Sequence, residues 1–243
     1  MTSSYAIISD VHANLEALTA VLDAINSEQA DQILFLGDSV GYGPDPNACI
    51  SLLMEKSRVM IAGNHDWAAV GLSDKSRFNP FAFSAIEWTA DVLTPDSDKA
   101  LKELPLTKEL ADDSMFLVHG TPREPEKWHY MRGEADGRIN FKYFAEKMCL
   151  VGHSHIPFIL ELIAGNKIVF HDNFATINKQ SRYIVNVGSV GQPRDGNPDA
   201  AYAFIGSEKI EIKRVPYDIV LTQKKIRKAG LPEYLADRLL LGR

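Results

Sequence analysis

Five short apolar segments of this chain each run directly into a cluster of Gly, Asp, Asn or His residues. The segments are rich in β-branched and aromatic side chains, and they cover residues 5–9, 32–36, 58–62, 115–118 and 147–151. This composition predicts β-strands. Apolar residues recur at helical spacing from Leu15 to Ile25, which predicts an amphipathic helix between the first two strands. Residues 1–66 are therefore expected to form a βαβαβ unit whose parallel strands end along one edge of a sheet, where ligands bind in open α/β folds.

The second half of the chain shows a different pattern. Short alternating segments separated by turn residues lie at about 158–164, 166–171, 182–187, 201–205 and 208–214. They predict a second, largely antiparallel sheet. A basic helix that ends near Gly230 and a short helix opened by Pro232 are expected to close the chain.

A helical stretch separates the two sets of strands. Helical periodicity covers residues 79–104 and includes a predicted helix from Asp98 to Leu104, so we expect a helical insertion at about 75–105. With 243 residues the chain can bury one substantial core, and we expect residues 1–243 to form a single domain.

The charge of the chain excludes some classes of partner. The formal net charge is −6, and residues 1–72 hold nine acids and two bases, whereas residues 207–243 hold five acids and nine bases. A chain this acidic, without a basic strip interleaved with aromatic residues, is a poor candidate for gripping long nucleic acid or an anionic membrane. The basic C-terminal region is expected to solvate a helix face, with attraction of an anionic ligand as the alternative.

Compartment and cysteine usage give two further expectations. The sequence has neither an apolar stretch of membrane-spanning length nor a signal peptide, so we expect a cytoplasmic protein without a membrane partner. Cys49 and Cys149 sit between apolar neighbours and are expected to be buried and free of disulfides.

The polar clusters at the predicted strand ends share one donor chemistry. They contain Asp10 with His12, Asp38, the run Asn64-His65-Asp66, His119, and His153 with His155. Imidazole nitrogen and carboxylate or amide oxygen without thiolate suit divalent Mn, Fe, Zn, Ni or Co. This number of donors exceeds what one ion needs, whereas two ions about 3.5–4 Å apart would use them and would clamp a phosphoryl group undergoing in-line displacement.

The spacing of the donors is consistent with this reading. Side chains two residues apart leave a strand on the same side. Asp10 and His12 are therefore expected to bind one ion where their strand ends, and His153 and His155 are expected to approach an ion from one side in the same way. Glycines beside the donors, such as Gly63 and Gly152, permit close backbone approach.

The ordered set of motifs resembles that of the calcineurin-like metallophosphoesterases. That family carries DxH, GDxxG, GNH(D/E), a later His-Gly and GHxH, which stand here as Asp10-Val11-His12, Gly37 to Gly41, Gly63 to Asp66, His119-Gly120 and Gly152 to His155. The stretches SDVHANLEAL, GDSVGYGPDP and GSVGQPRDG further resemble the compact bacterial and archaeal branch described as phosphodiesterases or diadenosine-tetraphosphatase-like proteins. Ala13 stands where Gly is common and Val187 where Pro is frequent, and neither departure removes a ligand.

The resemblance implies a fold and a cofactor. The fold is α/β (α+β), a four-layer αββα sandwich of two mixed β-sheets flanked by helices. Two divalent metal ions are implied, with Mn favoured among Mn, Fe, Ni, Co and Zn. The implied ligands are Asp10, His12 and His155 for one ion, and Asn64, His119 and His153 for the other, with Asp38 as the bridge.

The resemblance also implies an activity, hydrolysis of a small phosphoester through attack by a metal-bound hydroxide. His65 is then the candidate general acid that protonates the leaving oxygen. Asp66 is expected to orient and charge His65 through a hydrogen bond, with a simple turn or helix-cap role as the alternative.

Substrate contacts are expected from four further residues. Arg194 offers a guanidinium fork for phosphoryl oxygens, and Arg123 is a second candidate of the same kind. Asn14 and Tyr42 lie just beyond ligand clusters and are expected to face the pocket.

Several alternatives stay open on the sequence alone. The leading hypothesis is a dinuclear phosphatase or phosphodiesterase acting on a nucleotide-type phosphoester. The rival from another class is a non-catalytic scaffold of the same fold. Within the enzyme class, a phosphomonoesterase, a protein phosphatase and a nuclease remain, and the oligomeric state is open to a homo-oligomer.

Overall fold

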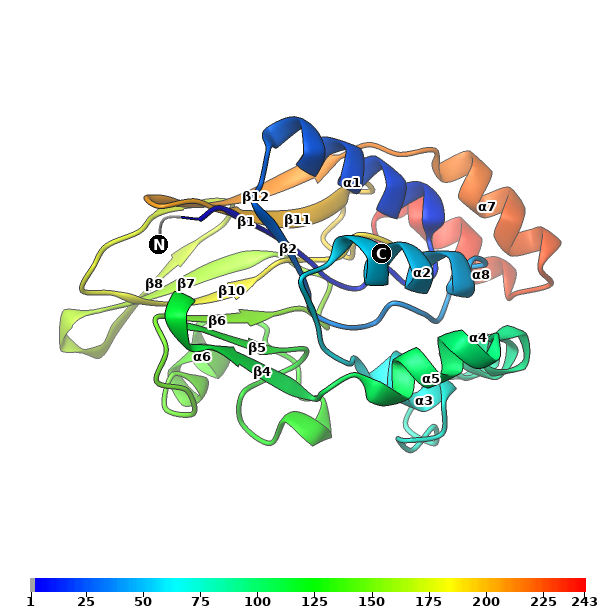
Figure 1. Ribbon diagram of the computed structural model, residues 1–243, viewed down its shortest axis with the longest axis horizontal. Coiled ribbons are helices and arrows are strands. Elements are labelled where there is room, and N and C mark those ends of the chain that lie inside the picture. Colours follow the sequence, from blue (N-terminus) through cyan, green and yellow to red (C-terminus); the bar gives the residue numbers. More distant parts are fainter. Residues whose placement is uncertain (1–2) are drawn as a thin grey trace.

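Two mixed β-sheets pack face to face in the computed structural model, which describes residues 3–243, and helices cover their outer faces (Figure 1). The first sheet has the order β3-β2-β1-β11-β12-β9. Its strands are β1 (Tyr5–Ile8), β2 (Gln32–Phe35), β3 (Val59–Met60), β9 (Phe174–Thr176), β11 (Ala200–Ile205) and β12 (Lys209–Val215). The second sheet has the order β4-β5-β6-β10-β7-β8. Its strands are β4 (Thr107–Leu110), β5 (Met115–Val118), β6 (Met148–Val151), β7 (Phe158–Ile163), β8 (Lys167–His171) and β10 (Arg182–Asn186).

Helices surround the sheets and fill the end of the molecule near the site. The α-helices are α1 (Leu15–Glu28), α2 (Pro46–Lys56), α3 (Asn64–Ala69), α4 (Pro80–Val92), α5 (Pro95–Glu103), α6 (Glu134–Asn140), α7 (Ile219–Lys228) and α8 (Glu233–Asp237). Short 3-10 helices are η1 (Ala111–Asp113), η2 (Pro125–Lys127), η3 (Ala164–Asn166) and η4 (Arg238–Leu241).

Alternating side chains on the strands build the layers. In β1, Tyr5 and Ile7 point into the core between the sheets, while Ala6 and Ile8 point outward under α1. In β6, Leu150 faces the same central core and its sequence neighbours face the cluster that α6 helps to cover. Because side chains alternate along a strand, one apolar segment can serve two cores. The four-layer αββα sandwich expected from the resemblance is confirmed.

The N-terminal unit has the predicted topology. β1 and β2 pair in parallel, with Tyr5 opposite Gln32, and β2 and β3 pair in parallel, with Leu34 opposite Val59. These strands, together with β5 and β6 of the other sheet, carry their C-terminal loops to one end of the sandwich. Each of these five loops contains one of the polar clusters found in the sequence.

The sequence predicted that the second half of the chain forms a separate, largely antiparallel sheet, and this prediction is wrong. β7, β8 and β10 join β5 and β6 in the second sheet, whereas β11 returns to pair antiparallel with β1 in the first sheet. Both sheets are therefore mixed. An alternating apolar pattern identifies a strand but does not identify its hydrogen-bonding partner, which is the physical reason for this error.

Some element boundaries also differ from the prediction. α5 begins at Pro95 rather than Asp98, because the hydroxyl of Thr94 accepts a hydrogen bond from the Ser97 amide at 3.2 Å and caps the helix there. β4 and β9 were not predicted, and β4 is a short edge strand whose TKEL sequence lacks the apolar alternation of a core strand.

Two observations bear on compartment and redox chemistry. No helix within residues 3–243 is long and apolar enough to cross a membrane. Cys49 and Cys149 are both buried as free thiols, which confirms the expectation from their apolar neighbours.

Candidate metal centre and its pocket

The loops that follow the parallel strands bring the predicted ligands to one end of the sandwich. Asp10 and His12 follow β1, Asp38 follows β2, and Asn64 begins α3. His119 follows β5, and His153 and His155 follow β6, so both sheets contribute. All seven side chains are at least nine-tenths buried. The structure thus brings together every residue that the sequence predicted as a metal ligand.

The local geometry at these loops differs from the one expected. Asp10 and His12 lie beyond the end of β1, and both adopt left-handed backbone conformations, with φ of 53° and 48°. Asp38, His153 and His155 do the same. Left-handed φ is costly for residues with a side chain and persists where the surroundings impose it. Loop backbone, rather than the pleat of a strand, therefore aims these side chains, which corrects the expectation drawn from their spacing.

Hydrogen bonds between loops hold the left-handed residues in place. The Asp10 amide donates to the Gly37 carbonyl at 3.0 Å, and the His12 amide donates to the Asp38 carbonyl at 3.0 Å. The His153 amide donates to Asp10 Oδ2 at 3.0 Å. Three separate loops are thereby joined, so the positions of the ligands depend on one another.

The first cluster consists of Asp10, His12 and His155. Asp10 Oδ1 lies 3.1 Å from His155 Nε2 and 3.7 Å from His12 Nε2, and the two Nε2 atoms are 3.1 Å apart. His12 Nδ1 lies 2.9 Å from the Val40 carbonyl, and His155 Nδ1 lies 2.5 Å from the Gln192 carbonyl. A carbonyl can only accept, so each Nδ1 carries the hydrogen and each neutral ring presents a lone pair at Nε2.

The second cluster consists of Asp38, His119 and His153, with Asn64 beside it. His119 Nδ1 donates to the Leu36 carbonyl at 2.8 Å and leaves Nε2 facing Asp38 Oδ2 at 3.2 Å. His153 Nε2 donates to the Trp128 carbonyl at 2.9 Å, so its Nδ1 is the lone-pair nitrogen. Asp38 Oδ2 also lies 3.7 Å from His12 Nε2, which places this carboxylate between the two clusters.

Unpartnered acceptors in both clusters provide a direct test of whether cations fit. Within the described residues 3–243, Asp10 Oδ1, Asn64 Oδ1 and His119 Nε2 are buried without a hydrogen-bond partner. Buried acceptors without partners are costly, and lone pairs that face one another across about 3 Å repel. A divalent cation in each cluster would accept the lone pairs of that cluster, so the residues present fit metal ions. The ligand atoms of each triad lie within 4.8 Å of one another, which is compatible with a shared ion.

The electrostatics of the clusters agree with this fit. Burial lowers the pKa of His12 and of His155 well below the usual value, and it lowers the pKa of His153 to about 3. Burial acts in the same direction on His119, but the carboxylates of Asp38 and Asp10 outweigh it and raise the pKa of His119 to about 9. Most of the imidazoles are therefore already in the neutral form that binds metal.

Glycine is required at one close approach in this centre. A Cβ atom on Gly63 would lie 2.1 Å from Asp38 Oδ1 and 2.4 Å from the Asp38 amide nitrogen. No side chain fits in that space without moving the central carboxylate. The glycine that precedes Asn64 therefore lets α3 approach the Asp38 loop.

His65 faces the pocket beside the first cluster. Its ring packs against His12 at 4.8 Å, Tyr42 at 4.6 Å and Phe78 at 4.8 Å between ring centroids. Its amide donates to Asp38 Oδ1 at 2.8 Å, and Nδ1 is buried without a partner in the described part of the chain. Burial, with a smaller contribution from Arg194, lowers the pKa of His65 to about 4, although Asp38 opposes the shift.

Asp66 has a different role from the one expected first. Its Oδ2 accepts hydrogen bonds from the amides of Gly63 at 2.9 Å and Asp38 at 2.8 Å, and its Oδ1 accepts from the Ser39 amide at 2.8 Å and the Ser39 hydroxyl at 2.6 Å. Both oxygens are thus engaged by the neighbouring loop rather than by the His65 ring. Asp66 caps α3 and holds the Asp38 loop, which is the alternative that the sequence left open.

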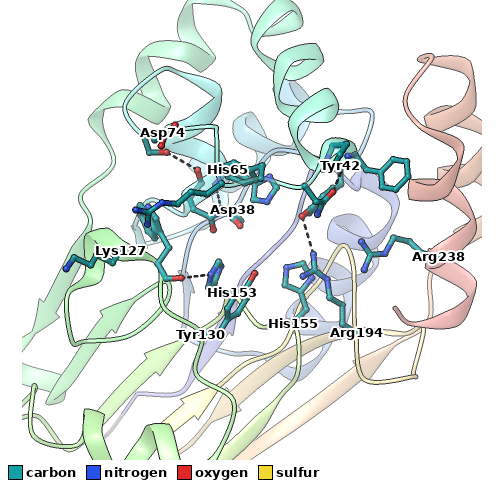
Figure 2. A pocket seen from close by; sticks show the side chains of 18 of the residues that line it. Asp38, Tyr42, His65, Asp74, Lys127, Tyr130, His153, His155, Arg194 and Arg238 are labelled. Carbon is teal, nitrogen blue, oxygen red and sulfur yellow. Dashed lines mark hydrogen bonds between the residues drawn. The ribbon is translucent and has the colours of Figure 1, made fainter.

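A pocket of about 610 Å³ opens over the two clusters (Figure 2). Arg194 and Tyr42 line it, as expected, and Arg194 Nη2 lies 3.4 Å from the Tyr42 hydroxyl. Exposed aromatic rings form part of its wall, those of Phe81, Tyr130 and Tyr234. The helical insertion predicted at about 75–105 contributes to this wall through the start of α4.

Two expected substrate contacts lie elsewhere. Asn14 is the N-cap of α1, accepting from the Ala17 amide at 3.1 Å, and it also donates to the Gly191 carbonyl at 2.9 Å. Arg123 lines a separate pocket of about 270 Å³ behind Trp128 and Tyr130. Proximity in sequence to a ligand cluster did not reveal that helix capping and a loop turn point these side chains away.

Some residues of the pocket were missed by sequence reasoning. Tyr130 stacks on His153 with a centroid distance of 4.2 Å and an angle of 11°, and Arg238 reaches the pocket from the C-terminal segment. The excess of bases near the C-terminus was the only signal for Arg238, and it was interpreted first as a solvated surface. No local motif marks Tyr130.

Known proteins share the sequence motifs and the fold of this chain. Residues 3–157 match the family model described as calcineurin-like phosphoesterase. The chain is 40% identical over 246 residues to an uncharacterized protein of Methanocaldococcus jannaschii, covering 99% of each chain. The crystal structure of a metallophosphoesterase from Sphaerobacter thermophilus superposes with a TM-score of 0.85 at 38% identity, covering 100% of both chains. A hypothetical protein from Pyrococcus horikoshii shares the fold, with a TM-score of 0.77 at 20% identity and coverage of 99% and 98%.

Proposed function

We propose that this chain, which belongs to the calcineurin-like phosphoesterase family, uses two divalent cations to hydrolyse a small nucleotide-type phosphoester. Its membership of the family makes it a metal-dependent phosphoester hydrolase. Asp10, His12 and His155 would hold one cation. Asn64, His119 and His153 would hold the other, with Asp38 shared between them. Manganese is the ion we favour among the divalent metals that nitrogen and oxygen donors without thiolate accept.

The observation that carries this proposal is the fixed orientation of the imidazoles. Each of the four histidines in the clusters donates one ring N–H to a backbone carbonyl and turns its other nitrogen toward the carboxylates. In His12, His153 and His155 a lowered pKa leaves that nitrogen unprotonated, and in His119 a bound cation would replace the proton that the carboxylates favour. Backbone carbonyls of this kind set the tautomer and ring angle of metal-binding histidines. A purely structural cluster would gain nothing from imidazole nitrogens that converge on two carboxylates.

Bound divalent cations supply activation of water and neutralisation of phosphoryl charge. The protein's own groups do the remaining work. Arg194 is held by Gln192 Oε1 at 2.8 Å and directs its guanidinium into the pocket, where it is placed to bind phosphoryl oxygens. His65 is neutral at neutral pH before substrate binds, because its pKa is about 4, so a bound phosphoryl anion must raise that pKa for His65 to donate a proton to the leaving oxygen.

The pocket wall supports a nucleotide-type substrate. Phe81 and Tyr234 stack on one another with a centroid distance of 4.7 Å, and both rings remain more than two-fifths exposed. Exposed aromatic rings beside a phosphate-binding centre offer a surface on which a base can stack. A simple alkyl phosphate has no ring that could stack on such a wall.

Metal analysis combined with a substrate panel tests the proposal. Protein purified and supplied with Mn²⁺ should hold about two equivalents of metal and hydrolyse p-nitrophenyl phosphate, its bis ester or the p-nitrophenyl ester of thymidine 5′-monophosphate. His119→Ala and Asp38→Ala should abolish turnover. His171→Ala is the matched control, because this histidine sits on β8 and pairs with Glu161 at 3.0 Å, away from the pocket.

Specific outcomes would overturn each part. Full activity of either ligand variant would rule out the assigned centre. A protein that binds no transition metal and hydrolyses none of the panel would be the non-catalytic scaffold instead. Faster turnover of simple aryl phosphates than of every nucleotide ester would remove the nucleotide-type part of the proposal.

A further inference from the structure

A loop segment with the sequence Trp128-His129-Tyr130 lies directly against the second cluster. This 128–130 segment lies in the loop between η2 and α6. Its backbone packs on the loop that follows β5, because a Cβ atom on Gly120 would lie only 2.8 Å from the His129 carbonyl oxygen. Glycine at position 120 therefore lets the segment approach the residue beside it in sequence, the metal ligand His119.

The backbone and the ring of His153 are held by different partners. The His153 amide donates to Asp10 Oδ2 at 3.0 Å, which fixes the backbone. The ring is held by the 128–130 segment: His153 Nε2 donates to the Trp128 carbonyl at 2.9 Å, and the Tyr130 ring stacks on the imidazole with a centroid distance of 4.2 Å and an angle of 11° (Figure 2). The last torsion of a histidine side chain has broad energy wells, so one hydrogen bond leaves the ring free to tilt. The flat face of Tyr130 blocks that tilt.

Trp128 extends the contact of the segment to the rest of the second cluster. Its ring lies edge-on to the His119 ring with 6.0 Å between centroids, and edge-on to the Trp67 ring at 5.7 Å. Trp67 belongs to α3, the helix that begins with Asn64. Aromatic pairs at these distances attract one another. The 128–130 segment therefore packs on both histidines of the second cluster and on the helix that carries its amide ligand.

Other segments hold the first cluster. His12 Nδ1 donates to the Val40 carbonyl at 2.9 Å, and the His12 ring packs on Tyr42 at 4.6 Å between centroids. His155 Nδ1 donates to the Gln192 carbonyl at 2.5 Å. The two clusters thus have separate supports for their imidazole rings. A change within the 128–130 segment should act on the second cluster and leave the rings of the first cluster in place.

The environment of Tyr130 indicates that its ring serves His153 rather than the core. Tyr130 is 42% exposed and lines both the main pocket and the smaller pocket beside Arg123. The guanidinium of Arg132 lies over the ring, 5.1 Å from its centre, and this cation–π contact helps to hold the ring in the stacked orientation. Substitution of an exposed side chain outside the core has little effect on folding stability, so the consequences of changing Tyr130 should appear at His153.

We propose that Tyr130 is a positioning residue for His153 and thereby sets the affinity of the second cluster for its divalent cation. The inference rests on the proposed function, because it takes the second cluster to be a cation site. Tyr130 acts through the imidazole and is not itself a ligand: its flat face keeps the ring at the angle at which the free nitrogen of His153 faces Asp38 and His119. Removal of a group that orients a metal ligand typically costs about 10–100-fold in metal affinity.

Calorimetric titration of the metal-free protein with Mn²⁺ tests this role. Tyr130→Leu keeps an apolar side chain but removes the flat face, so one of the two Mn²⁺ equivalents should bind about 10–100-fold more weakly while the other binds as in the wild type. Tyr130→Phe keeps the stacked face and should retain the wild-type affinity for both equivalents. In hydrolysis of p-nitrophenyl phosphate, Tyr130→Leu should need more Mn²⁺ for the half-maximal rate. It should approach the wild-type kcat at saturating Mn²⁺, because excess ion refills the weakened site.

Tyr143→Leu is the matched control. Tyr143 is also an exposed tyrosine, and it lies in the turn after α6, outside the lining of both pockets. Its replacement should leave the binding of both Mn²⁺ equivalents unchanged. Similar melting temperatures of the metal-free Tyr130→Leu and Tyr143→Leu proteins would show that the fold is intact in both.

Several results would overturn the positioning role. Unchanged affinity for both Mn²⁺ equivalents in Tyr130→Leu is one, and equal weakening of both equivalents, which would indicate a general loosening of the centre, is another. A loss in Tyr130→Phe as large as that in Tyr130→Leu would assign the effect to the hydroxyl group instead of the stacked face. A higher KM for the substrate with unchanged Mn²⁺ affinity would make Tyr130 a substrate contact. None of these results affects the proposed function, whose failure would appear as absence of Mn²⁺ binding by the wild type.

Discussion

Replacement of Asp66 tests the claim that the metal centre is held by a buried carboxylate that binds neither metal nor substrate. Asp66 is fully buried and accepts hydrogen bonds of 2.8–2.9 Å from the amides of Gly63, Asp38 and Ser39. Asp66→Ala removes the acceptor for these three amides at once, and for the longer hydrogen bond from the Val40 amide at 3.3 Å. The loop that carries Asp38 should then lose its anchor to α3.

The size of the effect follows from these contacts. Each buried amide left without an acceptor costs about 1–3 kcal/mol, so three amides give about 3–9 kcal/mol before relaxation. Entry of water and relief of the repulsion between Asp66 and Asp38 offset part of this sum. We expect the free energy of unfolding to fall by about 3–5 kcal/mol. In Asp66→Asn the free energy of unfolding should fall by roughly half as much. One side-chain oxygen remains an acceptor there, while the new NH₂ group faces amide donors.

Urea unfolding followed by circular dichroism measures the change on the metal-free proteins at pH 7. Asp218→Ala is the matched control, because Asp218 caps α7 by accepting one hydrogen bond from the Leu221 amide at 2.9 Å, and its loss should cost only about 1 kcal/mol. Calorimetric titration with Mn²⁺ gives a second readout, where Asp66→Ala should weaken binding about 10–100-fold. Equal destabilisation by the two alanine variants, together with unchanged metal affinity, would refute the anchoring role.

Three further predictions concern the centre and the core. Treatment with a chelator should lower the melting temperature, and added Mn²⁺ should restore it; no shift in calorimetry would contradict a metal centre that relieves buried, unpartnered acceptors. Gly63→Ala should weaken metal binding and activity strongly, since its Cβ would lie 2.1 Å from Asp38 Oδ1, whereas Gly206→Ala, with no atom closer than 3.5 Å, should leave both unchanged. Leu150 lies in the fully buried core between the sheets, so Leu150→Ala should lower the free energy of unfolding, measured with denaturant, by about 2–5 kcal/mol. A similar loss for Leu240→Ala, at an exposed position, would argue against this assignment of the core.

The metal ligands could be predicted from the sequence because they lie in short motifs whose residue types are visible along the chain. Parallel strands of one sheet that end in Asp or Asn bring those residues to one edge, so Asp10, Asp38 and Asn64 could be grouped without knowing any distance. His119 follows a strand of the other sheet, and only its residue type linked it to this group. The residue types then limit the ligand to a divalent cation. The same reasoning failed where a side chain serves the backbone, because nothing in the sequence distinguishes Asn14 as a helix cap from Asn14 as a pocket residue.

By itself the sequence determined all strands except β4 and β9, the polar clusters at the strand ends and the kind of ion those clusters can hold, since each depends on residues close together along the chain. Only the tertiary structure decided which sheet each later strand joins, because an alternating pattern fits either partner. It also decided that Asp66 anchors a loop, and that Tyr130 and Arg238 meet at one pocket. These contacts join segments far apart in the chain, and their geometry follows from packing rather than from any local motif.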